Sequence, residues 1–137
     1  MSLHSPIGSH PTYEEYQVDS TIVSIRIPTD GARYEWITKG NAMFDDAWRL
    51  RRDVIAAAEK HSRAAHTKFW SRIDDRPSQT QVFDIRGIWI DPKSKRVTYD
   101  VYDVFTDSTA NDGGVALPDE YAIDVELDST GSISVLE

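Results

Sequence analysis

The sequence predicts an α+β fold in which one long helix packs on an antiparallel sheet of five or six strands. Two observations lead to this prediction. Residues 41–76 contain neither glycine nor proline and are rich in alanine, which is typical of a helix. On both sides of that stretch, short segments alternate apolar and polar residues, which is typical of strands that bury one face and expose the other. The expected order of elements is ββ-α-ββ-ββ.

The start of the chain carries little pattern. Residues 1–20 are expected to form an irregular leader, and residues 21–137 a single α+β domain, because 137 residues is the size of one domain. Two tyrosines among polar residues in 11–20 leave open either an irregular lead-in or a short edge strand.

The first pair of strands is expected to be a hairpin. Residues 22–27 and 32–37 both alternate apolar and polar side chains, and the proline and glycine of 28–31 provide turn chemistry between them. In this arrangement Tyr34 and Trp36 share one face of the second strand and point inward.

The helix is then expected to begin after Gly40, which separates it from the hairpin. Asn41 is a suitable N-cap, and Asp45 and Asp46 lie near the positive end of the helix dipole. An unbroken helix would be about 50 Å long, so a bend or break near residues 61–62 is the alternative.

At about 100° per residue, the apolar side chains of this helix gather on one half of its surface. Four polar residues interrupt that half: Arg51, His61, Ser62 and His66. An unpaired charge buried there would be costly, so these residues are the first candidates for a special role.

The C-terminal part predicts four strands in two hairpins. Residues 81–90 and 97–105 flank a polar turn, and residues 121–127 alternate apolar with acidic side chains without a fault. A turn ending at Gly131 brings Ile133 and Val135 opposite the preceding strand.

The alternation and the helical period together predict which residues share the core. The following are expected to face one another there: Ile123, Val125, Leu127, Ile133 and Val135 from the strands, and Leu50, Val54 and Ala58 from the helix.

The net charge is −8, and its distribution is uneven. Residues 1–76 hold 11 acidic and 11 basic residues, whereas residues 77–137 hold 12 acidic and four basic residues. Such acidity disfavours nucleic acid and anionic membranes and favours a basic protein as partner, although it also serves solubility. The chain lacks cysteine, a secretory signal and a long apolar run, so we expect a soluble cytoplasmic protein.

The sequence contains no convincing motif for metal binding or catalysis. His61 and His66 are five residues apart, a spacing that turns two helical rings away from each other, so no metal site is expected. The acidic loop 107–113 places its glycine one position too late for a calcium-binding loop. Nucleophile and phosphate-loop motifs are absent from the sequence, and we expect neither catalytic residues nor a cofactor.

Two hypotheses about function remain. The first is a non-catalytic protein-binding module, comparable by charge and size alone to small acidic inhibitors of basic toxins or nucleases. Its acidic outer sheet face would dock a basic partner through Asp100, Asp124, Glu126 and Asp128. The alternative is a small-molecule binder or enzyme with a pocket between helix and sheet. That pocket would be lined by Arg51, His66, Asp103, Tyr34, Trp36 and Tyr99.

One contact is predicted specifically. Asp103 takes an apolar position in the alternating series of strand 97–105, just as Arg51 does in the helix. A guanidinium and a carboxylate satisfy each other when buried together, so we expect Arg51 and Asp103 to meet, directly or through water, where the helix crosses the sheet. The pair would either fix the helix on the sheet or hold an anionic ligand, with His66 near the entrance.

Overall fold

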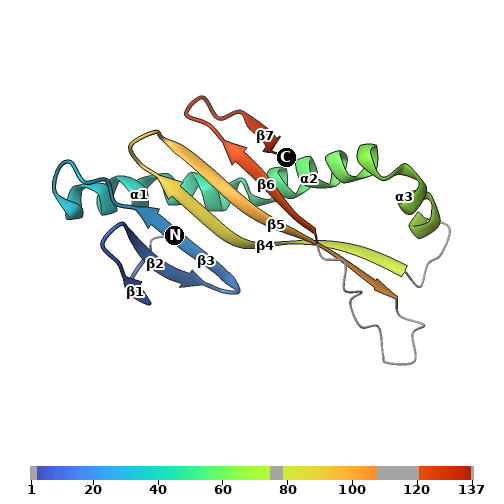
Figure 1. Cartoon of the computed structure of the whole chain (residues 1–137), viewed down its shortest axis with the longest axis horizontal. Helices are drawn as coiled ribbons and strands as arrows, with labels where there is room; N and C mark the ends of the chain where they lie inside the picture. Colours follow the sequence, from blue (N-terminus) through green and yellow to red (C-terminus); the bar gives the residue numbers. More distant parts are fainter. Residues whose placement is uncertain (1–2, 75–78, 108–120, 137) are drawn as a thin grey trace.

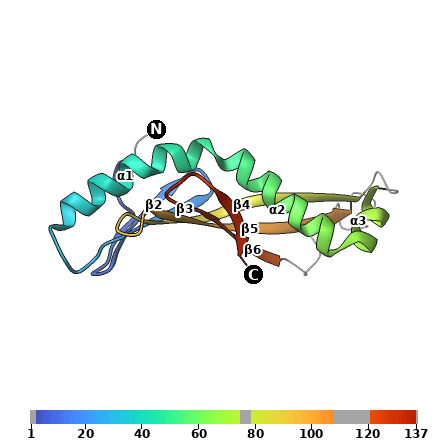
Figure 2. The ribbon, with the colours of Figure 1, turned by 90° about the horizontal axis from the view of Figure 1, so that it is seen from above.

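The computed structural model of the chain describes residues 3–74, 79–107 and 121–136. Within these ranges, side chains are described except at residues 69, 72–74, 79–82, 103–107 and 121. The described part of the chain forms a two-layer α+β structure, with one sheet and three helical segments on one of its faces (Figures 1 and 2). The predicted α+β class is therefore confirmed, whereas the single long helix that was expected is divided into separate helical segments.

Seven strands lie side by side in the order of the sequence. They are β1 (Gly8–Ser9), β2 (Tyr13–Val18), β3 (Thr21–Arg26), β4 (Gln79–Asp91), β5 (Arg96–Asp107), β6 (Tyr121–Leu127) and β7 (Ile133–Leu136). Neighbouring strands are antiparallel except β3 and β4, which run parallel because the helical segments connect them. The sheet thus has more strands than the five or six expected, since residues 8–18 contribute β1 and β2.

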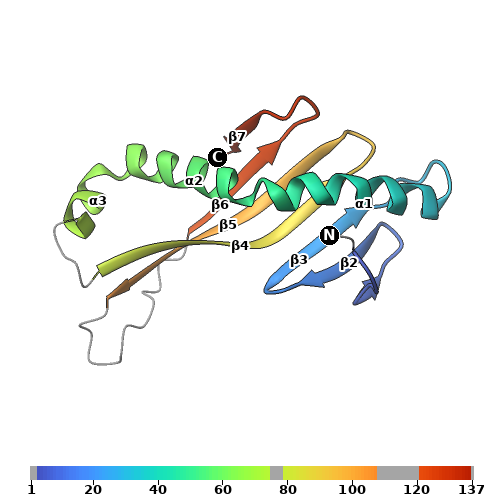
Figure 3. The same cartoon turned by 180° about the vertical axis from the view of Figure 1, so that it is seen from behind.

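The helical segments are α1 (Arg33–Arg49), α2 (Arg51–Ala65) and α3 (Thr67–Asp74). Seen from behind, α1 and α2 form one long bent rod that crosses the strands (Figure 3). The bends lie at Leu50 and His66, so the alternative of a break near residues 61–62 is wrong. At Leu50 the backbone hydrogen bonding of the helix continues, because the Leu50 N–H donates to the Asp46 carbonyl at 3.0 Å and the Leu50 carbonyl accepts from Val54 at 3.0 Å.

The predicted strand at 32–37 is wrong, because α1 already begins at Arg33. Six residues of apparent alternation fit a helical period equally well once the chain is read onward to the buried residues Phe44 and Ala47. The first turn is held by Arg33, whose guanidinium forms an ion pair with the buried Glu14 of β2 and donates to the His10 carbonyl at 2.8 Å. Asn41 is therefore not an N-cap. Its side-chain oxygen accepts a hydrogen bond from the Leu3 N–H at 2.9 Å.

Gly40 does not end a hairpin but lies buried inside α1, against β3. A Cβ atom added there would lie 2.5 Å from Cγ2 of Ile25, which is fully buried. A glycine in mid-helix is normally unfavourable by about 1 kcal/mol relative to alanine. Here the missing side chain allows the helix backbone to approach the sheet.

The core between helices and sheet contains the predicted residues. Val54, Ala58 and Val125 are fully buried, and Leu127 is 7% exposed. The remaining predicted core residues are half-buried and pack against this cluster: Leu50, Ile123, Ile133 and Val135. The core prediction is confirmed.

Candidate functional site: the outer face of the sheet

The face of the sheet opposite the helices carries no layer of the described chain (Figures 1 and 2). The strand residues that alternate with the core residues point to this side, which we call the outer face. Its central strands present the following side chains: Asp84, Trp89 and Asp91 from β4, Arg96, Thr98, Asp100 and Tyr102 from β5, and Asp124 and Glu126 from β6.

Three acidic residues of the outer face have arginine partners. Asp91 pairs with Arg26 at 3.0 Å, Glu126 with Arg96 at 3.3 Å, and Asp84 with Arg86 at 3.9 Å. All three arginines are more than two-fifths exposed, so these pairs are worth little as stabilising contacts. They nevertheless neutralise the borders of the face.

The centre is different, because Asp100 and Asp124 oppose each other across β5 and β6. Among the described residues, no basic side chain lies within 4.0 Å of either carboxylate. Burial raises the pKa of the Asp100 carboxyl, and the charge of Asp124 raises it further, whereas Arg86 lowers it. Like charges placed opposite each other on neighbouring strands destabilise a sheet. The centre of the outer face therefore holds negative charge that a cation from outside could neutralise.

Gly87 lies beside this acidic pair, because the register places it opposite Asp100. A β-bulge between Ile85 and Gly87 makes Arg86 the extra residue of β4. A Cβ atom at Gly87 would lie 3.3 Å from the Cβ of Asp100, which is shorter than an ordinary van der Waals contact. The glycine thus leaves the backbone open next to the carboxylate.

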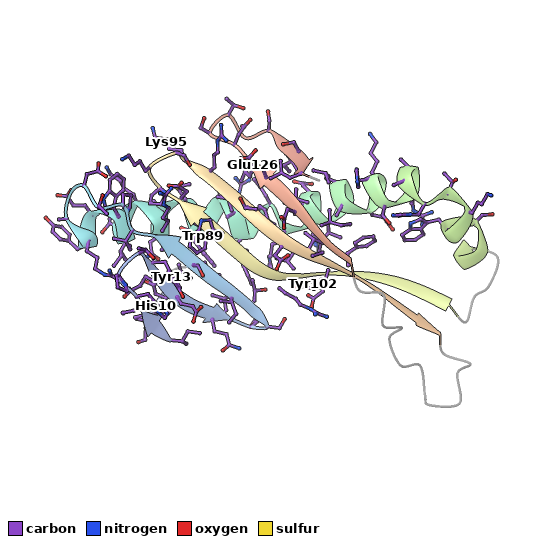
Figure 4. All side chains as sticks on the ribbon, viewed as in Figure 1. His10, Tyr13, Trp89, Lys95, Tyr102 and Glu126 are labelled. Carbon is purple, nitrogen blue, oxygen red and sulfur yellow. The ribbon has the colours of Figure 1, made fainter. Side chains whose placement is uncertain are left out.

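The outer face also carries aromatic side chains, among them Tyr13, Trp89 and Tyr102, which Figure 4 labels. Trp89 is 39% exposed, and the Tyr13 ring lies 5.8 Å from it, with His10 stacked on Tyr13 at 4.1 Å. The Arg86 guanidinium lies 4.2 Å from the ring of Tyr102. Trp, Tyr and Arg are the residue types that most often dominate binding at protein interfaces.

The residues predicted from sequence to bind a partner mostly lie on this face. Asp100, Asp124 and Glu126 are there as expected from strand alternation, although Glu126 is engaged by Arg96. Asp128 lies beyond the end of β6, where its carboxylate accepts hydrogen bonds from the backbone of Thr130 at 2.9 Å and of Ser132 at 3.0 Å. The Thr130 hydroxyl also donates to this carboxylate, at 2.6 Å, and together with these backbone bonds it lowers the pKa of Asp128 and holds the β6–β7 turn.

The residues of the predicted pocket are not gathered in one place. Tyr34 is 70% exposed on α1, so its predicted inward orientation is wrong; the reason is that it belongs to a helix rather than a strand. Tyr99 is fully buried and donates a hydrogen bond to the Ala47 carbonyl at 2.6 Å, and burial raises its pKa strongly. His66 is exposed at the end of α2, about 20 Å along the helix from Arg51.

Arg51 contacts its own helix. Its Nε donates to the Trp48 carbonyl at 2.7 Å, and its guanidinium stacks on the Trp48 ring at 3.6 Å. The side chain of Asp103 lies outside the described residues, so its pairing with Arg51 stays a prediction. Trp36 lies beside the β4–β5 turn, where Lys39 covers its ring at 4.7 Å.

Sequence reasoning missed the aromatic residues of the outer face. The position of Trp89 could have been predicted from the sequence, because it stands between two isoleucines, Ile88 and Ile90, both of which are buried. A tryptophan out of phase with the buried positions of a strand must lie on the opposite face.

No protein-family model, no curated protein and no solved structure matches this chain. Over residues 3–74, 79–107 and 121–136, no group of three or more metal-ligating side chains comes together. None of the helices in those ranges is long and apolar enough to cross a membrane.

Proposed function

We propose that this protein is a non-catalytic protein-binding module that docks a basic protein surface on the outer face of its sheet. The observation that carries the proposal is the opposed pair Asp100 and Asp124: among the described side chains, no basic group lies within 4.0 Å of either carboxylate, although the charge of Arg86 acts on Asp100 from farther away. A lysine or arginine of a partner protein would supply the missing charge. It would also relieve the repulsion between the two carboxylates.

The surroundings of the pair support a protein as partner. Trp89 is broad, apolar and partly exposed, so it can serve as an anchor that a partner covers. The stem of an arriving arginine can pack on its indole face, with the guanidinium directed toward Asp100 across the open backbone of Gly87. A partly exposed tryptophan beside an acidic centre therefore suits a partner that brings both an apolar surface and a cation.

The charge of the whole chain supports the same assignment. A net charge of −8 attracts a basic protein over several ångströms before contact, which raises the association rate at low salt. Asp91 and Glu126, at the borders of the outer face, should contribute less to affinity, because arginines of the same chain already form ion pairs with them.

The experiment is an affinity capture from the source cell at low and at high salt, with a photo-crosslinking residue in place of Thr98 on the outer face. We expect a basic protein to be crosslinked at low salt and to be lost at high salt. The same crosslinker in place of Arg52, which is exposed on α2, is the matched control and should not label that protein.

A variant then tests the residues. Asp100→Asn with Asp124→Asn should weaken capture of the crosslinked protein about tenfold or more. Glu35→Gln with Asp53→Asn removes the same amount of charge from the exposed helical side and should change capture little. Equal effects of the two double variants, or labelling from position 52, would contradict the outer face as the binding surface.

A further inference from the structure

A groove lies between α1 and the turns of the β4–β5 and β6–β7 hairpins, on the side of the molecule that Figure 3 faces. Its volume is about 700 Å³, within the range of small-molecule sites in proteins. Apolar side chains form its floor: Trp36 and Met43 from α1, Leu50 at the bend between α1 and α2, Val97 from β5 and Leu127 from β6. The groove is separate from the outer face, since it is built on the helical side.

The rim of the groove is cationic although the protein as a whole is acidic. Lys39, Arg49, Lys93 and Lys95 border it, against the acids Asp46 and Asp128. Both acids are already engaged, Asp46 by Arg49 at 2.9 Å and Asp128 by the backbone of its own turn. Lys93 is held by Asp30 at 3.0 Å.

Lys39 and Lys95 are the cations left over. Among the described residues, neither ammonium group has a carboxylate within 4.0 Å. Lys39 instead lies over the ring of Trp36, on the floor of the groove. An anion that enters the groove would therefore meet unneutralised positive charge beside an apolar surface.

The backbone at Lys95 gives a second reason to connect this residue with a ligand. Its φ is +59°, in the left-handed region where glycine or asparagine is normally favoured. A lysine in this conformation costs roughly 1 kcal/mol or more. Strained positions of this kind are found preferentially at functional sites. The turn keeps a charged side chain where stability alone would favour glycine.

We propose that this groove binds a small amphipathic anion: a molecule with an apolar body that lies on Trp36, Met43 and Leu127, and one carboxylate that Lys39 and Lys95 receive. The floor excludes a purely polar anion, because its apolar area would then be left uncovered. The two lysines exclude an uncharged apolar molecule as the preferred ligand, since they reward a negative charge. This binding is independent of the proposed docking of a protein on the outer face.

Titration with decanoate, observed through amide and indole N–H signals in a two-dimensional NMR spectrum, tests the proposal. The Trp36 indole N–H, which donates to the Asp30 carbonyl, should shift together with the Gly131 amide beside the groove. The Trp89 indole on the outer face should stay in place and serves as the internal control. Shifts at Trp89 without shifts at Trp36, or an absence of saturable shifts, would overturn the proposal.

Two comparisons test the charge. Decanol has the same chain without the carboxylate and should bind at least about fivefold more weakly. Lys39→Gln with Lys95→Gln should weaken decanoate about tenfold and leave decanol unchanged. Lys60→Gln, on the exposed side of α2, is the control for general charge and should change nothing. Equal binding of decanol and decanoate to the natural protein would contradict the role of the lysines.

Lys95→Gly separates loss of the site from loss of the fold. Glycine relieves the left-handed conformation, so its melting temperature should equal or exceed that of the natural protein. Its affinity for decanoate should nevertheless fall severalfold. A Lys95→Gly protein that binds decanoate as tightly as the natural protein would show that Lys95 takes no part in binding.

Discussion

Asp100 is a residue whose ionised form reduces the stability of the folded protein, although the proposed binding surface depends on its charge. Its carboxyl is half-buried on β5, opposite Asp124, and both burial and that neighbour raise its pKa above the ordinary value. A carboxyl that is harder to ionise in the folded protein than in the unfolded chain reduces stability wherever it is ionised in both states. The penalty is complete at pH above the folded pKa and disappears as the pH falls below the unfolded pKa.

The first prediction follows from this sign. Asp100→Asn should raise the free energy of unfolding at pH 7 by a few tenths to about 1 kcal/mol, because it removes the ionised group opposite Asp124. The difference from the natural protein should shrink toward zero as the pH is lowered past about 4. Urea unfolding at several pH values measures it. A variant that is less stable at pH 7 would show that the carboxylate has a stabilising partner.

Arg51 shows how far single-residue reasoning from sequence reaches. The helical period identified it correctly as a charge in an apolar sector, and the structure gives it a special environment. Its hydrogen-bond partner, however, is the carbonyl of Trp48 at the bend of the helix. Side-chain patterns do not reveal a backbone acceptor at a bend, so this contact could not be predicted from the sequence. The predicted contact of Arg51 with Asp103 stays a prediction, because that side chain lies outside the described residues.

Among the elements, α1 is the one whose position depends most on a single absent side chain. Gly40 lets its backbone approach β3, and the Cβ that alanine would add lies 2.5 Å from Cγ2 and 2.8 Å from Cδ1 of Ile25. Ile25 is fully buried, so it has little room to move.

The second prediction is that Gly40→Ala destabilises the protein by about 1 to 3 kcal/mol despite the better helix propensity of alanine. Chemical denaturation measures the change. Ala56→Gly, at an exposed position of α2, gives the propensity effect alone and should cost about 1 kcal/mol. If Gly40→Ala instead gained stability by a similar amount, the close approach of α1 to β3 would be refuted.

Elements were predicted well where the pattern was long and poorly where it was short. The strands predicted at 81–90 and 97–105 correspond to β4 and β5 with ends shifted by at most two residues, because apolar alternation persists along both. The segment 32–37 was misassigned, since six residues satisfy a period of two and a period of 3.6 equally. The turn at 28–31 before it, with one proline and one glycine, fitted either a hairpin or the entry to a helix.

The whole molecule is two layers around one core, so residues from distant parts of the chain should unfold together. The third prediction is that Val54→Ala and Val125→Ala each lower the free energy of unfolding by about 1 to 4 kcal/mol in a single transition. Leu136→Ala removes a side chain that is 41% exposed and should cost clearly less. Separate transitions for the two valine variants, followed by fluorescence and circular dichroism, would contradict one shared core.

At this scale the sequence anticipated the layers and the acidic side of the sheet, but not the register. The opposition of Asp100 and Asp124 exists only because β5 and β6 pair with Val101 opposite Ile123. A shift by one residue would place either acid in the core, and a shift by two would separate them. The groove depends similarly on where two turns lie against α1, which loop composition does not determine.

The parallel junction of β3 and β4 has a consequence for the chain as it is made. Every hydrogen bond between these strands joins residues about 65 positions apart, such as Ile22 and Gly87, whereas β2 and β3 meet across a tight turn. On a ribosome that adds roughly 5–20 residues per second, β3 waits several seconds for its partner. Throughout that interval an edge containing Val23 and Ile25 is open to other chains, which makes the nascent hairpin the point where aggregation would start.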